Sequence, residues 1–258
     1  MVLTGEAPFS QRIALVTGGG RGIGHAIALR LAQGGAKVVV AGRTQTEIDE
    51  VAKAIGGVAL RVDLGDRADI TRALGVLAEL GRVDILVNNA GIAASAPYDR
   101  TTDEVWDRTF QINVHAAFAL TRALVPAMIK AGFGRVINVA SNAGRMGYAY
   151  TTAYCAAKHA MVGMTRALAA EIARTPVTVN AVCPGWVETR MVEEATSRIA
   201  SKTGRSQDDA RATLAAMSPQ NRLMEANEVA HLVASLCAVE ARGIHGQAIP
   251  IDGGQVMA

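Results

Sequence analysis

The sequence predicts an α/β protein in which helices cover both faces of a doubly wound, seven-stranded parallel sheet. Short runs rich in β-branched residues alternate with helical patterns from one end of the chain to the other. Most of these runs are solid blocks of apolar residues, which is typical of parallel strands buried on both faces. The predicted strands are Ile13–Thr17, Lys37–Ala41, Val58–Val62, Val83–Asn88, Arg135–Ala140, Val177–Val182 and Ala248–Ile251. Such strand–helix–strand units cross over with a right hand and build a parallel sheet.

The segments between the strands carry helical periodicity. Ile23, Ile27 and Leu31 recur on one face of a helix, and the Gly34-Gly35 pair that follows is a helix stop signal. Near the other end of the chain, the apolar residues of 229–236 recur at the spacings i, i+3, i+4 and i+7. Each pattern predicts an amphipathic helix with one face on the sheet.

The composition favours one domain. Half of the 258 residues are apolar and 19% are charged, which supplies material for a large core, and no linker divides the chain. We therefore predict a single domain, 1–258. The stretch 186–219 departs from the alternation because it is polar and charged, with possible helix ends around Gly204. Long segments of this kind are usually functional, so we predict a substrate lid here; a solvated helical hairpin is the alternative.

Charge and residue usage argue against several classes of protein. The net charge is +3 and the two signs are interleaved, so no basic stripe indicates a nucleic-acid partner. Cys155, Cys183 and Cys237 are sparse and unpaired in spacing, which fits buried thiols in a reducing compartment. The histidines are scattered, so we expect no metal site. Without about 18 consecutive apolar residues we expect no membrane span, and a cytoplasmic protein.

A glycine-rich turn follows the first predicted strand and opens directly into a helix. Its residues are Gly18, Gly20, Arg21, Gly22, Ile23 and Gly24, in a GxxxGxG spacing. Glycines let a backbone approach a pyrophosphate closely, and the helix beyond offers unpaired N–H groups. The strand before it and the helix after it predict a Rossmann-like dinucleotide-binding domain.

The end of the second strand indicates which dinucleotide is bound. An acidic residue there would bind the adenosine 2′-hydroxyl of NAD, whereas an arginine accommodates a 2′-phosphate. This sequence has Arg43 and Thr44, with no carboxylate before Glu47. Arg21, in the glycine turn, is expected to reach the same phosphate from the other side, since guanidinium groups suit dianions. NADP(H) is therefore the predicted cofactor, and a solvated loop cation is the alternative role for Arg43.

Further motifs follow the glycine turn in a fixed order. They are Asp63-Leu64 after the third strand, Asn88-Asn89-Ala90-Gly91 after the fourth, Asn113 in the next helix, Ser141 after the fifth strand, the Tyr154/Lys158 pair, and Pro184-Gly185 with Val187 and Thr189 after the sixth. In these motifs and their separations the chain resembles the short-chain dehydrogenase/reductase family along nearly its whole length. The basic residues Arg21 and Arg43 resemble the NADP-preferring branch of that family.

The resemblance implies which residues carry the chemistry. It assigns catalysis to Asn113, Ser141, Tyr154 and Lys158. The residues expected to bind NADP(H) are Gly18, Gly20, Arg21, Gly22, Ile23, Gly24, Arg43, Thr44, Asp63, Leu64, Asn89, Ala90, Gly91, Tyr154, Lys158, Pro184, Gly185, Val187 and Thr189. The family moves a hydride between a nicotinamide and a carbonyl/alcohol pair.

The side chains suit that chemistry. Tyr154 and Lys158 are one helical turn apart, and a nearby ammonium favours phenolate, so we expect the pKa of the phenol to fall. Ser141 is expected to hydrogen-bond the substrate oxygen. The resemblance further implies that Lys158 anchors the cofactor ribose and that Asn113 holds a water linked to the lysine. For each residue a packing role is the alternative.

The substrate is the least determined part of the prediction. Segments 154–163 and 179–191 resemble 3-oxoacyl-thioester reductases and polyketide ketoreductases, which implies an acyl-thioester substrate on acyl carrier protein or coenzyme A. The alternatives are another secondary alcohol or ketone, such as a sugar, steroid, terpenoid or cyclic ketone, and more distantly a non-catalytic NADP-sensing protein. Kinship also implies a homo-oligomer, with a tetramer favoured, paired through the helices that carry Asn113 and Tyr154.

Overall fold

The computed structural model describes residues 7–257 and forms one α/β domain around a seven-stranded sheet. Residues 1–6 and 258, at the ends of the predicted domain, lie outside the described part. The strands are β1 (Ile13–Thr17), β2 (Lys37–Gly42), β3 (Val58–Arg61), β4 (Ile85–Asn88), β5 (Gly134–Val139), β6 (Val177–Pro184) and β7 (Ala248–Ile251). All pair in parallel, in the order β3-β2-β1-β4-β5-β6-β7, so the predicted fold class is confirmed.

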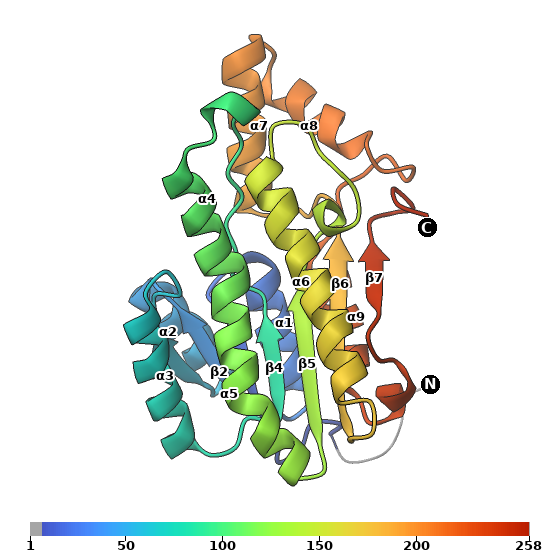
Figure 1. Cartoon of the computed structure of the whole chain (residues 1–258). Helices are drawn as coiled ribbons and strands as arrows, with labels where there is room; N and C mark the ends of the chain where they lie inside the picture. The colour runs from blue at the N-terminus through green and yellow to red at the C-terminus, as the bar shows by residue number, and fades with distance from the viewer. Residues whose placement is uncertain (1–6, 258) are drawn as a thin grey trace.

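Helices connect successive strands and cover both faces of the sheet (Figure 1). They are α1 (Gly22–Gln33), α2 (Gln45–Ile55), α3 (Arg67–Leu80), α4 (Asp103–Phe110), α5 (Ala116–Lys130), α6 (Thr152–Glu171), α7 (Arg190–Thr203), α8 (Gln207–Ala215) and α9 (Ala226–Cys237). A π-helical turn, Gln111–His115, joins α4 to α5, and a short 3₁₀ turn, η3 (Asn142–Gly144), follows β5.

Two apolar layers hold the helices to the sheet. On one face Ile27 and Leu31 of α1 pack with Val233 of α9 in a single buried cluster. On the other, Leu77 of α3 and Leu120 of α5 belong to a second cluster. Every residue of β5 and β6 is buried, and the apolar residues of these strands are accompanied by the buried polar side chains of Arg135, Asn138, Thr178 and Asn180.

The predicted strand limits agree with the structure to within about two residues. The main differences are at β4, which begins at Ile85 rather than Val83, and at β6, which continues to Pro184. The helix predicted from Ile23, Ile27 and Leu31 ends at Gln33, just before the Gly34-Gly35 pair. Helix termini and strand ends depend on capping and pairing partners, which periodicity does not specify.

One continuous helical stretch, Asp103–Lys130, is long and apolar enough to cross a membrane by length and composition alone, and 44% of its most apolar window is buried. Its residues Ala116, Leu120 and Met128 pack into the core beside the sheet. A core helix of a globular domain meets the same criteria, so this stretch is weak evidence for a membrane span.

Segment 186–219 contains two helices, α7 and α8, where the sequence predicted an atypical polar stretch. Gly204 lies between them in the left-handed region, with φ of 70°, and ends α7. Figure 1 shows both helices beyond the end of the sheet toward which the strands point. The segment therefore stands over the carboxyl ends of the strands.

Candidate active site

The predicted site residues all follow the carboxyl ends of strands, on one edge of the sheet. The chain order reverses between β1 and β4, which are neighbours in the sheet although β2 and β3 come between them in sequence. In open parallel sheets the connecting loops part at such a reversal and leave a crevice for a ligand. The glycine turn follows β1 and the Asn88–Gly91 motif follows β4, so both sides of this crevice carry predicted cofactor residues.

The glycine turn packs so closely on its neighbours that residues with a side chain would not fit there. Gly18 and Gly22 have positive φ angles of 63° and 54°. A Cβ atom on Gly24 would collide with the carbonyl oxygen of Gly18, so only glycine lets α1 begin this close to β1. A Cβ on Gly22 would meet Cγ2 of Thr189 at 3.2 Å, which places the start of the predicted lid beside the turn.

Thr17 and Asn89 join the two sides of the crevice. The Thr17 hydroxyl donates to the carbonyl of Val87 (3.2 Å) and accepts from the backbone N–H groups of Asn89 and Ala90 (3.0 and 3.1 Å). The Asn89 amide donates in turn to the carbonyls of Thr17 (2.8 Å) and Gly18 (3.3 Å). Asn89 and Ala90 therefore fix the glycine turn, in addition to any contact with a ligand.

The turn fits a dinucleotide pyrophosphate. The N-cap of α1 is Arg21, whose side chain makes no capping hydrogen bond, and the first turn of α1 holds no acidic residue. The first N–H groups of α1 thus have no side-chain cap, and the helix dipole favours an anion at that point. The missing Cβ atoms of the turn leave the backbone open to close approach.

The two arginines predicted to share a phosphate differ in their surroundings. Arg43 is exposed at the end of β2 and forms no ion pair within residues 7–257. Arg21 instead lies 3.4 Å from Oε1 of Glu47, in the first turn of α2. In this structure Arg21 is thus paired with a carboxylate, and its convergence with Arg43 on a phosphate stays a prediction. Sequence spacing missed Glu47 because α2 turns it back against the glycine turn, where a Cβ on Gly20 would meet its Cβ at 3.0 Å.

The remaining predicted cofactor residues line the same edge. Asp63 follows β3, and its Oδ1 accepts from the N–H of Gly65 at 2.8 Å. The carbonyl of Leu64, which is buried, accepts from the Gln111 side chain at 3.3 Å. Thr44 occupies the N-cap position of α2, without a capping hydrogen bond from its side chain. Ile23 is partly buried against the core, and Pro184 is the last residue of β6.

Gly185, Val187 and Thr189 carry the chain from β6 toward the glycine turn. The N–H of Gly185 donates to the carbonyl of Ile251 at 3.1 Å, and Val187 bridges to Met224. Thr189 is the N-cap of α7. These contacts hold the first residues of the predicted lid against the carboxyl ends of the strands.

Ser141, Tyr154 and Lys158 are brought together by α6 and the end of β5. Ser141 follows β5, and its hydroxyl is hydrogen-bonded to the phenol of Tyr154. Lys158 is 3% exposed, and its Nζ donates to the carbonyl of Val139 at 2.8 Å. The same Nζ lies 5.7 Å from the centre of the Tyr154 ring. A hydroxyl, a phenol and an ammonium thus lie together, next to the Asn88–Gly91 motif, where a Cβ on Gly91 would lie 3.5 Å from Lys158 Nζ.

The pKa of the phenol is not lowered, contrary to our expectation from the Tyr154–Lys158 spacing. Removal of water from around the side chain raises the pKa of Tyr154 to about 12, and the hydrogen bond with Ser141 opposes this shift. Burial likewise lowers the pKa of Lys158 to about 8, and the nearby Cys183 opposes this change. Desolvation disfavours the charged form of each group and is the largest cause of both shifts.

Asn113 lies in the π-helical turn, where it is completely buried. Its Nδ2 donates to the carbonyls of Ile92 (3.0 Å) and Thr109 (2.9 Å), and its Oδ1 accepts from the N–H of Ile92 (3.2 Å). The amide therefore fastens the loop after β4. Gly91 lies between Asn113 and Lys158. A Cβ at this position would collide with Asn113 Oδ1 and lie 3.5 Å from Lys158 Nζ, so only glycine leaves room for both side chains.

The chain matches the family model described as short chain dehydrogenase over residues 12–200. It belongs to the short-chain dehydrogenase family. The match covers the glycine turn, the Asn88–Gly91 motif, Ser141 and the Tyr154/Lys158 pair.

Relatives resemble this short-chain dehydrogenase over nearly their full lengths. The 3-oxoacyl-[acyl-carrier-protein] reductase FabG of Escherichia coli (strain K12) is 39% identical over 96% of this chain and 99% of that protein. The granaticin polyketide synthase putative ketoacyl reductase 1 of Streptomyces violaceoruber is 37% identical, over 95% and 93%. A crystal structure of a variant actinorhodin polyketide ketoreductase with NADPH has a TM-score of 0.91 and 34% identity, and the match covers 95% of this chain and 97% of that one.

Two further polar side chains, Cys155 and His159, lie next to the reactive pair in sequence. Cys155, expected to be buried, is only partly so, and its sulfur lies 3.3 Å from the hydroxyl of Thr151. His159 is exposed, with Nδ1 2.9 Å from the carbonyl of Cys155. Neither side chain makes a contact with Tyr154 that would give it a part in the chemistry.

Sequence reasoning also missed a polar cluster next to Ser141 in this short-chain dehydrogenase. Asn142 and Asp252 are both buried and hydrogen-bonded to each other at 2.8 Å. Tyr148 joins them through hydrogen bonds with Asn142 and Gln255, while burial raises its pKa. Asn142 and Tyr148 are more than a hundred positions from Asp252 and Gln255 in sequence, and no family motif marked them. The Asp252-Gly253-Gly254 turn was the one visible signal.

The buried lysine predicts a pH-dependent effect on stability. A pKa lowered from 10.5 to about 8 corresponds to about 3 kcal/mol of destabilisation at pH 7, where both folded and unfolded chains carry the charge. Between the folded and unfolded pKa values the folded chain binds fewer protons, so this cost fades as pH rises. Lys158→Met should therefore stabilise the protein relative to the wild type at pH 7, and much less at pH 10.

Urea unfolding at both pH values measures this difference. Lys130→Met, at the exposed end of α5, is the control and should show no comparable pH dependence. Equal effects of Lys158→Met at pH 7 and pH 10 would contradict a costly buried ammonium at this position.

Proposed function

We propose that this short-chain dehydrogenase uses NADPH to reduce the keto group of a 3-oxoacyl thioester to a secondary alcohol. The observation that carries the proposal is the contact of Ser141 with Tyr154 beside Lys158, on the sheet edge that holds the glycine turn. Two relatives named as reductases of 3-oxoacyl or ketoacyl groups support the substrate class. The solved ketoreductase that contains NADPH supports the cofactor.

The chain's own contribution is to place a proton donor at the carbonyl oxygen. NADPH, when bound, supplies the hydride that adds to the carbonyl carbon. Negative charge then develops on the oxygen, and the Tyr154 hydroxyl donates the proton that completes the alcohol. A pKa of about 12 keeps this phenol protonated at neutral pH, as reduction requires. The Ser141 hydroxyl donates a second hydrogen bond to the same oxygen.

Lys158 and Asn113 support this step without donating the proton themselves. The Lys158 ammonium stabilises the phenolate that remains after proton donation, because it is buried and lies 5.7 Å from the centre of the Tyr154 ring. We expect its Nζ to donate to cofactor ribose hydroxyls as well. Asn113 fastens the Gly91–Ile92 backbone beside the lysine through its side chain, so a water in the proton path would contact other atoms of this turn.

Arg43 is the residue we propose as the selector of NADPH. Its guanidinium is exposed at the end of β2, where the adenosine ribose of a dinucleotide lies in Rossmann-like domains. Arg21 and Glu47 form an ion pair in this structure. Arg21 therefore contributes to selection only if it leaves Glu47 and binds the phosphate. Arg43 therefore carries most of the discrimination.

Segment 186–219 is proposed to act as a lid over the acyl chain. Met191 and Met217 are 41% and 37% exposed, and the Trp186 N–H points to the Met217 sulfur at 3.2 Å. Methionine and aromatic side chains adapt to flexible apolar substrates. Slower amide hydrogen exchange across α7 and α8 in the presence of NADPH and product would support closure, and unchanged exchange would argue against it.

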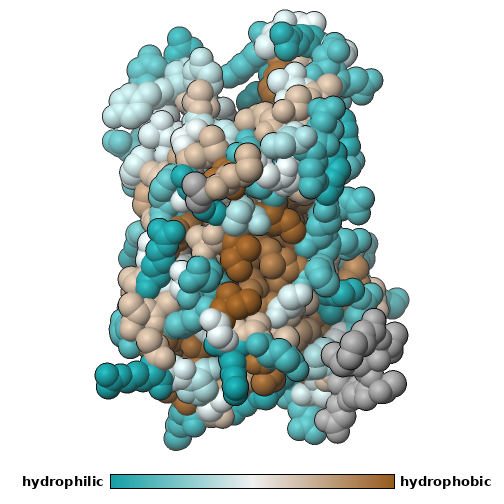
Figure 2. Space-filling view, turned by 90° about the vertical axis from the view of Figure 1, so that its right-hand side faces the viewer, coloured by the Kyte–Doolittle hydropathy of each residue, from teal (hydrophilic) through white to brown (hydrophobic). Residues whose placement is uncertain are grey.

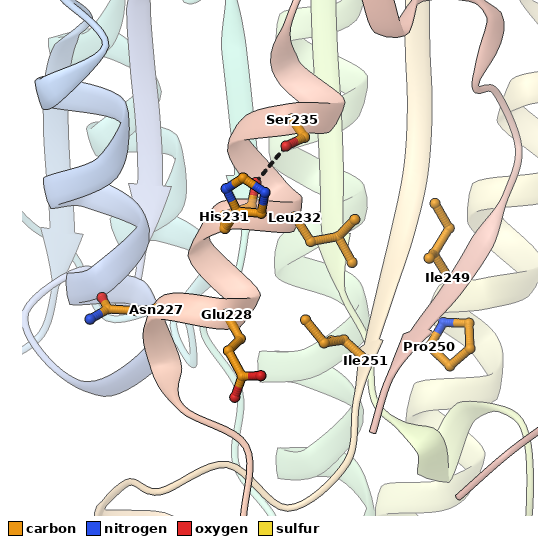
Figure 3. Close-up of a pocket in the computed structure, with 8 residues that line it drawn as sticks. All are labelled: Asn227, Glu228, His231, Leu232, Ser235, Ile249, Pro250 and Ile251. Atoms are coloured by element: carbon orange, nitrogen blue, oxygen red, sulfur yellow. Dashed lines mark hydrogen bonds between the residues drawn. The ribbon is translucent and has the colours of Figure 1, made fainter. Parts of the chain in front are cut away.

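A homotetramer is proposed as the assembly. Figure 2 shows an apolar area on the face where β7 forms the edge of the sheet. A groove of about 650 Å³ lies there, between α9 and β7, and contains none of the predicted site residues. Figure 3 shows Leu232 of α9 and Ile251 of β7 directed into it.

A second exposed apolar face supports the tetramer over a dimer. Phe118 of α5 and Trp106 of α4 are 48% and 39% exposed. Two separate self-complementary faces are what a D₂ tetramer needs. Sedimentation equilibrium tests this, and a monomer at micromolar concentration would refute it. We also propose a cytoplasmic location, supported by three free cysteines and testable by cell fractionation.

Tyr154→Phe should lower kcat by about 100-fold or more, because it removes the proton donor while keeping the ring. NADPH binding should change little, since Lys158 and the glycine turn are intact. NADPH oxidation with a 3-oxoacyl-CoA and fluorescence titration of NADPH measure the two effects. Tyr98→Phe, at a tyrosine 81% exposed, is the control.

The same assay separates the rival functions. Turnover of cyclic ketones but not of 3-oxoacyl thioesters would replace the substrate class. Tight NADPH binding without turnover of any carbonyl would indicate a non-catalytic sensor. Full activity of Tyr154→Phe would remove the proposed acid.

Arg43→Asp should shift cofactor preference toward NADH. The carboxylate repels the 2′-phosphate and accepts a hydrogen bond from a 2′-hydroxyl, so affinity for NADPH should fall by about tenfold or more. Calorimetric titration with both cofactors measures the change. Arg242→Asp, exposed in a turn after α9, alters the net charge equally and should leave both affinities unchanged. A variant that still prefers NADPH would show that Arg43 is not the selector.

A further inference from the structure

The turn that follows β7 lies against the segment that carries Ser141. β7 is the edge strand next to β6, and Asp252 comes directly after it. Asp252 is 5% exposed, and its Oδ2 accepts from Asn142 Nδ2 at 2.8 Å. A Cβ on Gly185 would meet the Cβ of Asp252 at 3.0 Å, so the turn also packs on the chain leaving β6.

The Asp252 carboxylate is held by three donors. Besides Asn142, the backbone N–H of Gly254 donates to Oδ1 at 2.9 Å, and that of Val256 donates to Oδ2 at 2.9 Å. Hydrogen bonds from several donors compensate a buried carboxylate for its lost water. Gly253 and Gly254 take φ angles of 65° and 89°, which permit the tight turn these bonds require.

Asn142 connects Asp252 to the segment that carries Ser141. It is 1% exposed and adjoins Ser141, and its carbonyl accepts from the N–H groups of Arg145 (2.8 Å) and Met146 (2.9 Å). Its Nδ2 also reaches Oε1 of Gln255 at 3.2 Å.

The phenol of Tyr148 extends the cluster. It is hydrogen-bonded to Asn142 and Gln255, and it interacts electrostatically with Tyr154. The cluster of Asn142, Tyr148, Asp252 and Gln255 thus spans the whole segment from Ser141 to the start of α6.

We propose that Asp252 is a positioning residue, which through its buried hydrogen bond to Asn142 holds Ser141 in line with Tyr154 and the substrate oxygen. The inference rests on the proposed function, because it concerns the geometry of that reaction. Ser141 sits at a chain turn, where its hydroxyl also accepts from the N–H of Ala143 at 3.1 Å. A donor that must meet a developing charge loses rate when its position loosens.

The same turn also reaches the proposed lid. A Cβ on Gly253 would collide with the hydroxyl of Ser218 and lie 3.2 Å from the Gln220 side chain. Ser218 is itself buried, just after α8. The Asp252 turn therefore contacts the Ser141 segment on one side and the end of the lid on the other.

The test compares two buried aspartates. Asp252→Asn places an amide against the Asn142 amide and should lower kcat for the 3-oxoacyl substrate by about tenfold, with NADPH affinity within about twofold of the wild type. The control is Asp84→Asn: Asp84 is 2% exposed and accepts from the N–H of Ile13 at 3.0 Å, at the opposite end of the sheet. It should lower the unfolding temperature and leave kcat unchanged.

Rescue distinguishes positioning from general stability. Exchanging the partners in Asn142→Asp/Asp252→Asn restores an N–H to carboxylate bond with its direction reversed, and should recover several-fold of the lost kcat. Should Asp252→Asn fold poorly, Gln255→Ala leaves the carboxylate in place and should give a smaller loss, of about threefold. An Asp252→Asn enzyme that behaves like Asp84→Asn, or an exchange without recovery, would overturn the proposal.

A readout without turnover keeps this inference separate from the proposed function. Amide hydrogen exchange over residues 141–148 should accelerate in Asp252→Asn and not in Asp84→Asn. An inactive wild type would refute the proposed reaction, while unchanged exchange over 141–148 would refute the role of Asp252 whatever the reaction is.

Discussion

The site depends on one constraint of parallel sheets: every strand ends on the same edge, and each chain must leave that edge through a loop. At the reversal between β1 and β4 the loops that follow these strands run in opposite directions. The space between them is occupied by the backbone of the glycine turn and not by side chains. Gly24 allows α1 to begin against the carbonyl of Gly18, and Thr17 and Asn89 tie the two loops together. The remaining site residues come from loops, such as Ser141, and from helices, such as Asn113 in the π-helical turn and Tyr154 and Lys158 in α6.

The protein removes water from this edge, and that sets the protonation states. Desolvation raises the pKa of Tyr154 to about 12 and lowers that of Lys158 to about 8. Both shifts keep the groups nearer to neutral than free side chains are. A phenol with a pKa of about 10 or about 12 is protonated at neutral pH, so the shift leaves Tyr154 in the proton-donor state that reduction requires. In the lysine the shift is a cost, because its buried charge lowers stability. Catalytic residues often carry such a cost.

Much of the fold and most of the site were predictable from local patterns. Short runs rich in β-branched residues, most of them solid apolar blocks, identified all seven strands, and the turn at Gly18–Gly24 marked the helix predicted to bind phosphate. The prediction was wrong where spacing was used to infer electrostatics: the i, i+4 relation of Tyr154 and Lys158 suggested a lowered phenol pKa. It also missed Glu47, because the partner of Arg21 depends on how α2 packs against the glycine turn.

The sequence by itself determined the positions of the seven strands, the glycine turn and the motifs that contain Ser141, Tyr154 and Lys158, because each is encoded within a few neighbouring residues. Only the tertiary structure decided how Asp252 meets Asn142, how Gly91 separates Asn113 from Lys158, and how dry the phenol is. Those properties arise from contacts between residues 20 to more than 100 positions apart, and a periodic pattern contains no information about such pairs.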